Sequence, residues 1–140
     1  MKRILFICLI LVVGCESSGP EFVGGGDTQN FQGVLEPEQV VQRHDFFLTN
    51  EGTVRFELVQ LAATDPETDL PIETPTVLLS IGRQTLEGEC GITFSRVLLE
   101  GGSYSVYLDN IAYCLQVFRG TNLPLESIVI YDVALVPAFS

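Results

Sequence analysis

The chain of 140 residues has no tryptophan, one histidine, one methionine and one lysine. His44 is therefore the only histidine that could act as a catalytic base, and Asp45, as its neighbour on a strand, would point to the opposite face. The sequence also contains no Gly-x-Ser-x-Gly elbow, Walker loop, dinucleotide fingerprint or HExxH helix. It predicts a protein that is not an enzyme.

Positive charge is also scarce. Beyond residue 15 the chain has five arginines against all 18 of its carboxylic acids, which is a formal charge of −13. Such a surface repels phosphate backbones and anionic lipid headgroups. We therefore expect no nucleic-acid partner, and we expect any contact with a membrane to be made through an anchor.

The chain lacks the roughly 20 consecutive apolar residues that a spanning helix needs. Its longest apolar run, residues 4–13, has ten residues and follows Lys2-Arg3, which is the pattern of an export signal. The run ends in Val12-Val13-Gly14-Cys15, which resembles the lipobox of bacterial lipoproteins. An ordinary secretory signal with an incidental cysteine is the alternative.

The lipobox resemblance implies cleavage after Gly14 and lipid on Cys15, so that acyl chains hold the protein in a bilayer. Glu16, in place of an aspartate, implies sorting to the outer membrane of the cell envelope. The Gly/Ser-rich stretch that follows reads as a flexible linker. The expected organisation is a signal peptide at 1–14, a lipidated tether at 15–30 and one domain at 31–140.

The body of the chain alternates strands and turns. Residues 53–58 and 103–108 alternate apolar and polar side chains, the period of a strand with one wet face. Further strands are expected at 31–35, 44–49, 76–81, 92–99, 112–118 and 127–136. About eight short strands separated by turn residues predict an all-β fold, an antiparallel sandwich or a jelly roll.

Several of these segments resemble the bacterial pre-peptidase C-terminal domains, which are small β-sandwiches. The resemblance rests on residues 31–35, on His44–Leu48 leading into Gly52-Thr53-Val54, on Val77–Ile81 and on Leu99–Val106. It implies a non-catalytic accessory module. Members of that family often bind calcium through acidic residues before the strand that corresponds to 76–81.

Two cysteines remain after the signal and the anchor, Cys90 and Cys114. An even pair in an exported domain predicts a disulfide, and two free thiols or a metal pair are the alternatives. A possible calcium site lies in the acidic loop before residue 76, at Asp65, Glu67 and Asp69. A solvated, proline-stiffened loop is the alternative there.

Sugar stacking would need exposed aromatic rings, and Tyr107 and Tyr131 are the candidates. Tyr107 lies on the wet phase of its strand, whereas packing in the core is the alternative for the tyrosines as a set. The last strand is apolar on both faces, so it is central or has its outer face covered.

These features leave two functions, a module that binds an envelope protein or a glycan and a purely structural envelope lipoprotein. If Val129, Tyr131, Val133 and Leu135 form an exposed outer face of the last strand, a protein partner is favoured. If they are covered and Tyr107 stands in a groove, a glycan is favoured. If neither holds, the structural role is favoured.

Overall fold

The computed structural model describes residues 21–23 and 28–137, and Cys15 lies outside them. Nine strands make up the regular secondary structure of these residues. They are β1 (Glu21–Val23), β2 (Gln29–Leu35), β3 (Val41–Leu48), β4 (Gly52–Thr64), β5 (Val77–Gln84), β6 (Cys90–Leu98), β7 (Ser103–Leu108), β8 (Ala112–Arg119) and β9 (Ile128–Pro137). No helix in this part of the chain is long and apolar enough to cross a membrane.

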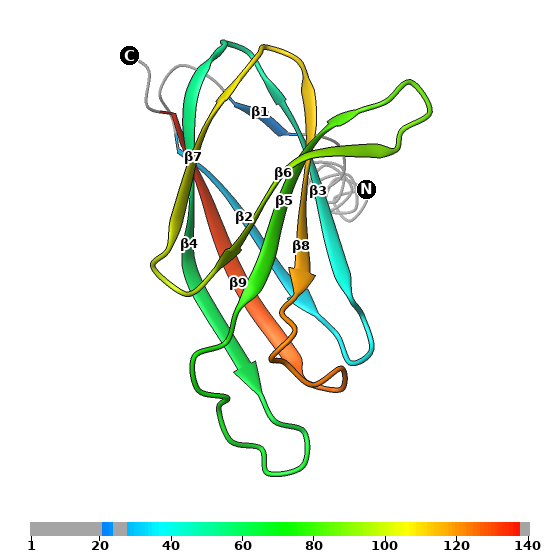
Figure 1. Ribbon diagram of the computed structural model, residues 1–140, viewed down its shortest axis with the longest axis vertical. Helices are drawn as coiled ribbons and strands as arrows, with labels where there is room; N and C mark the ends of the chain where they lie inside the picture. The colour runs from blue at the N-terminus through cyan, green and yellow to red at the C-terminus, as the bar shows by residue number, and fades with distance from the viewer. Residues whose placement is uncertain (1–20, 24–27, 138–140) are drawn as a thin grey trace, which may run out of the picture.

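The strands form two packed sheets (Figure 1). The five-stranded sheet has the order β1-β3-β8-β5-β6, and the four-stranded sheet has the order β2-β9-β4-β7. All pairs are antiparallel except β1 with β3. The predicted all-β sandwich is confirmed, and eight of the nine strands are the expected ones.

The core lies between the sheets and follows the alternation of the sequence. In β4, Val54, Phe56 and Leu58 are fully buried, while Arg55 points outward. Each such buried side chain contributes roughly 1.5–3 kcal/mol relative to exposure to water. The alternation therefore selects which face of each strand packs against the other sheet.

The last strand, β9, is central, as its composition predicted, because β2 and β4 flank it. Of the two possibilities that the sequence left open for its odd-numbered residues, exposed or covered, the structure shows the covered one. Val129, Tyr131, Val133 and Leu135 point into the core and are at most 1% exposed. The outward-facing residues are the even-numbered ones, among which Ile128 and Ile130 are exposed. In a strand that is apolar on both faces, inward and outward positions carry the same kind of side chain. The sequence therefore could not decide which of the two faces points into the core.

Ordered structure begins earlier than residue 31. β1 lies within the stretch expected to be tether, and β2 starts at Gln29. β1 pairs with Phe46–Leu48, the last residues of β3. If Cys15 carries the anchor, six residue steps separate it from β1, which span about 20 Å when fully extended.

Arg119 ties the loops at the other end of the sandwich together. Its guanidinium donates to the carbonyl oxygens of Glu36, Gln39, Pro124 and Ser127 at 2.7–3.1 Å, and to Ser127 Oγ at 2.7 Å. These contacts join the β2–β3 loop to the β8–β9 loop. Burial lowers the pKa of Arg119 from its ordinary value, but a guanidinium stays protonated under all ordinary conditions.

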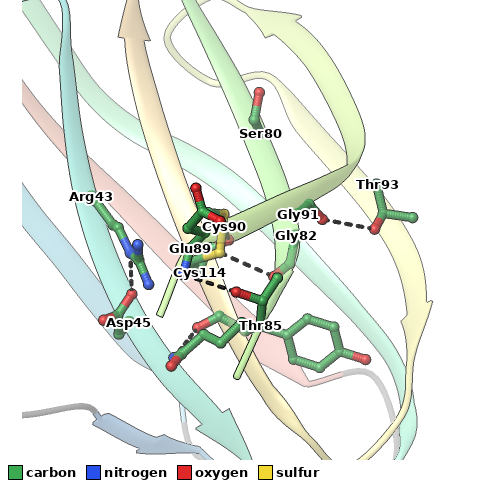
Figure 2. Close-up of a disulfide and its surroundings, with 12 residues drawn as sticks. Arg43, Asp45, Ser80, Gly82, Thr85, Glu89, Cys90, Gly91, Thr93 and Cys114 are labelled. Atoms are coloured by element: carbon green, nitrogen blue, oxygen red, sulfur yellow. Dashed lines mark hydrogen bonds and ion pairs between the residues drawn. A yellow bond between two sulfur atoms is a disulfide. The ribbon is translucent and has the colours of Figure 1, made fainter. Parts of the chain in front are cut away.

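Cys90 and Cys114 form the predicted disulfide, with Cα atoms 5.9 Å apart (Figure 2). It links β6 to β8 across β5, because the tip of the β5–β6 hairpin bends over the outer face of the five-stranded sheet. Gly82 lies beneath the bend, where an added Cβ would come within 2.4 Å of the Gly91 carbonyl oxygen.

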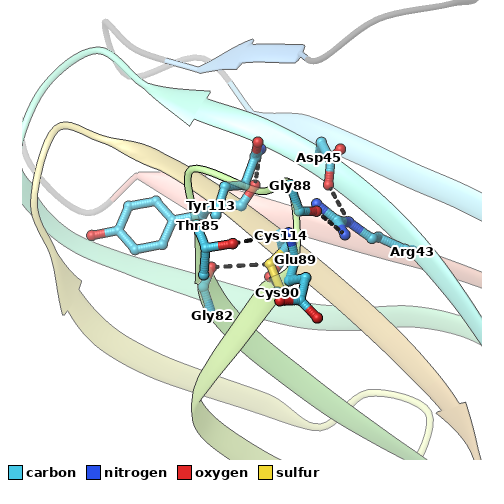
Figure 3. Close-up of polar contacts among 10 residues, drawn as sticks. Arg43, Asp45, Gly82, Thr85, Gly88, Glu89, Cys90, Tyr113 and Cys114 are labelled. Atoms are coloured by element: carbon cyan, nitrogen blue, oxygen red, sulfur yellow. Dashed lines mark hydrogen bonds and ion pairs between the residues drawn. A yellow bond between two sulfur atoms is a disulfide. The ribbon is translucent and has the colours of Figure 1, made fainter.

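Arg43 on β3 donates to the Gly88 carbonyl oxygen at 2.8 Å and pairs with Asp45 at 2.6 Å (Figure 3). We call residues 84–91 the strap.

Candidate binding surfaces

A small hollow of about 120 Å³ opens between the two sheets beside Tyr107. It is lined by Ile81, Gly82, Arg83, Thr93, Phe94, Tyr107, Leu108, Asp109 and Tyr113. These residues come from β5, β6, β7, β8 and the turn after β7, so both sheets contribute. We call it the Tyr107 hollow.

Tyr107 is 57% exposed, as the wet phase of its strand predicted. Its hydroxyl donates to Glu51 Oε2 at 2.6 Å. That hydrogen bond, followed by partial desolvation and the negative charges of Glu51 and Asp109, raises the pKa of Tyr107. The hydroxyl therefore stays protonated at physiological pH, and its hydrogen bond to Glu51 holds the ring in place. The exposed part of the ring is left open to a ligand.

A charged pair accompanies Tyr107. Arg83 Nη2 and Asp109 Oδ2 are 3.0 Å apart, and both side chains are largely exposed. Tyr113 is buried and accepts a hydrogen bond from the Asp109 backbone at 2.8 Å. Burial raises the pKa of Tyr113, against a smaller opposing effect of the hydrogen bond from the Asp109 backbone. The hollow thus combines apolar ring surface with fixed hydrogen-bonding groups, the mixture typical of small-ligand sites.

The sequence singled out Tyr107 but missed Arg83, Phe94 and Asp109. Asp109 follows Tyr107 by two residues in the turn after β7. It could have been predicted by considering the polar residues next to each candidate tyrosine in the sequence. Arg83 and Phe94 lie on strands of the other sheet. Nothing local in the sequence tells which strands face each other at an open side of a sandwich.

Tyr131 is not a surface binding residue, and this part of the prediction is corrected. It is 1% exposed, and its hydroxyl lies 2.6 Å from His44 Nε2, across the two sheets. Burial raises the pKa of Tyr131, so the hydroxyl keeps its proton. Gly33 makes room for it, since a Cβ there would be 2.3 Å from the Tyr131 oxygen.

His44 and Asp45 point to opposite faces of β3, as expected for neighbours in a strand. His44 packs against Phe31 inside the sandwich, with ring centroids 5.5 Å apart. Burial lowers the pKa of His44, against a smaller opposing effect of Asp45. Asp45 pairs with Arg43 on the outside. The two side chains are not arranged as a catalytic base and its orienting partner.

The acidic loop between β4 and β5 is held by its own hydrogen bonds. Asp65 accepts from the backbone N–H of Glu67 at 2.9 Å, and the Asp69 N–H donates to the Asp65 carbonyl oxygen at 2.8 Å. Within residues 21–23 and 28–137 no group of three or more His, Cys, Asp or Glu side chains is placed to hold a metal ion. The calcium hypothesis stays a prediction without structural support.

No family model and no curated protein matches this chain. The chain is similar in structure to a Yersinia pseudotuberculosis-derived mitogen at 10% identity, with a TM-score of 0.50 over 83% of this chain and 90% of the mitogen. The pre-peptidase C-terminal domain of a Bacillus anthracis collagenase matches at 9% identity and a TM-score of 0.42, over 85% of this chain and 96% of that one. An Aeromonas hydrophila periplasmic inhibitor of g-type lysozyme, PliG, matches at 10% identity and a TM-score of 0.46, over 84% and 94%. At this identity the likeness to the mitogen shows a common fold and leaves the ligand open.

Proposed function

We propose that this chain is an exported, lipid-anchored binding module of the bacterial cell envelope, and that it takes a neutral glycan in the Tyr107 hollow. The observation that carries the glycan assignment is the composition of the hollow, whose lining includes Tyr107, Thr93 and the Arg83–Asp109 pair. Sugars present apolar C–H faces that stack on rings and hydroxyl groups that bind paired polar side chains. Its function is binding, without catalysis.

Charge narrows the class of glycan. The mature chain has a formal charge of −13, so it disfavours polyanionic polysaccharides for the same reason that it disfavours nucleic acids. Within the hollow, the positive charge of Arg83 is already paired with Asp109. Uncharged hexoses and N-acetylhexosamines meet neither obstacle.

The position of the hollow suits a short anchor. The Ile111 carbonyl oxygen accepts from the Leu48 N–H at 3.1 Å, so the turn that carries Asp109 lies against the end of β3 that pairs with β1. The β7–β8 turn and β1 lie at the same end of the sandwich (Figure 1), and Asp109 in that turn lines the hollow. With lipid on Cys15, that end faces the membrane, and the glycan is one found close to the bilayer surface.

The test is binding of the unlipidated chain, from residue 16 onward, to a panel of neutral oligosaccharides built from hexoses and N-acetylhexosamines. We expect one or more to bind and Tyr107→Ala to abolish that binding. Ile130→Ser, which is outside the lining of the hollow on the outer face of β9, is the matched control and retains it. Binding by none of the sugars, or equal binding by Tyr107→Ala, would refute the glycan assignment.

A further inference from the structure

The four-stranded sheet has an aliphatic patch on its outer face, away from the Tyr107 hollow. Val34, Val59, Ile128 and Ile130 are 40–47% exposed there. The register places Val34 directly opposite Ile130, and Val59 lies at the bulge of β4. Single exposed aliphatic residues are ordinary, but four of them on the outer face of three neighbouring strands are what a contact surface offers. We call these four residues the outer patch.

The outer patch is a rigid platform. Its central strand, β9, is hydrogen-bonded on both sides, to β2 and to β4. A partner can therefore contact β9 only through its side chains and cannot add a strand beside it. A shallow groove of about 350 Å³ runs along it, bordered by Val34, Gln60 and Ile130.

A carboxylate is held in place in this groove. Asn30 Nδ2 donates to Asp132 Oδ1 at 2.9 Å, and Gln32 Nε2 donates to Asp132 Oδ2 at 3.2 Å. The two amides orient the carboxylate without neutralising it. The ion pairs among the described residues use other acids, so Asp132 has no cationic partner among them.

The arginines of the sandwich are already engaged. Arg43, Arg55 and Arg83 pair with Asp45, Glu57 and Asp109, Arg96 lies over the ring of Tyr104, and Arg119 binds backbone carbonyls. Lysine is absent beyond residue 2. This surface offers acids to a partner and no unengaged cation, so the complementary surface is aliphatic and surrounded by Lys or Arg.

We propose that the outer patch docks a basic protein, whose aliphatic side chains cover Ile128 and Ile130 while one of its cations pairs with Asp132. A second copy of this chain is a poor occupant, because two protomers of charge −13 repel each other and a two-fold contact would bring the Asp132 carboxylates together. The apolar groove on the other sheet, formed by Val40, Leu78, Val97 and Phe118, has no carboxylate in its lining. It therefore lacks the charge that selects this partner.

The experiment begins with the full chain in the cells that produce it. A photoreactive benzoylphenylalanine replaces Ile130, and a control chain carries it in place of Val97. The protein crosslinked from position 130 is identified, purified and titrated against the unlipidated chain at about 50 and about 500 mM salt. We expect a basic protein to crosslink from position 130 and not from position 97, and to bind more weakly at high salt.

Variants connect the binding to the patch. Ile130→Asp should weaken binding at least about tenfold, whereas the matched control Val97→Asp leaves it unchanged. Asp132→Asn, which keeps the shape of the side chain, should reduce the salt dependence even if Ile130→Asp does not fold. No adduct, the same adduct from both positions, an acidic protein, or a second copy of this chain would overturn the proposal. Tyr107→Ala should leave this binding intact, so the two sites can fail independently.

Discussion

The Cys90–Cys114 disulfide gives the most quantitative prediction. The cysteines are 24 residues apart in the sequence. Closing a loop of that length removes conformational entropy from the unfolded chain worth about 3.5 kcal/mol at 25 °C on the chain-entropy account. Net stabilities of domains this size are about 5–15 kcal/mol, so the bond supplies a large share.

Removing the bond should lower the melting temperature substantially. For a domain of about 110 residues the unfolding entropy near the midpoint is about 0.23 kcal/mol/K, so 3.5 kcal/mol corresponds to roughly 15 °C. The variant is Cys90→Ala with Cys114→Ala, since alanine leaves no unpaired hydroxyl at the buried Cys114 position. Thermal unfolding followed by circular dichroism measures the shift.

The reduced wild-type protein separates the crosslink from packing. If the crosslink is responsible, wild type in reductant melts within a few degrees of the double variant. A drop of less than about 4 °C in both would refute the reasoning. A large drop in the variant alone would assign the effect to packing around Cys114. Without the disulfide, the strap loses its covalent link to β8, so amide hydrogen exchange should increase mainly in the strap. Arg43 in β3 still donates to the Gly88 carbonyl oxygen, so exchange in β3 should change little.

Four further outcomes follow from the structure. Arg119→Lys should cost about 2–4 kcal/mol in chemical denaturation, because an ammonium cannot reach carbonyls in two loops at once, and an unchanged midpoint would contradict this. Gly33→Ala should cost about 1–3 kcal/mol by forcing the Tyr131 ring to move, and a loss-free variant would show that the ring has room. Burial depresses the pKa of His44 in the folded state below 6.5, so the stability that the neutral His44 contributes is complete above pH 6.5 and is lost as the pH falls through the folded-state pKa. Between about pH 7.5 and 5.5 the melting temperature of wild type should therefore fall more than that of His44→Gln. Parallel melting curves for the two proteins would count against the effect. Cys15→Ser should abolish incorporation of labelled palmitate and release the protein from membranes, whereas a variant that still fractionates with membranes would argue against the lipid anchor.

The sequence predicted most of the fold because strand alternation is a local signal. In β4 and β7 the wet and dry positions can be read directly, and the exposure of Tyr107 follows from that reading. β9 has no such contrast, so its central place was predictable but its inward face was not. β1 was missed because Glu21–Val23 is short, lies beside a glycine run and is ordered by pairing with β3.

The candidate site was only partly predictable for a related reason. Tyr107 could be chosen from its own strand, but Arg83 and Phe94 join it because β5 and β6 happen to close the side of the sandwich where β7 ends. The outer patch likewise depends on register, which sets Val34 beside Ile130. Contacts between strands distant in the sequence are set by topology, and composition does not reveal them.

The most direct test of the central claim is a heteronuclear NMR titration of the unlipidated chain with the neutral oligosaccharide that binds most tightly. The glycan account predicts chemical-shift changes at Arg83, Phe94, Tyr107 and Asp109, with little change along β9. Changes centred on Ile130 and Asp132, or no change at saturating sugar, would contradict it.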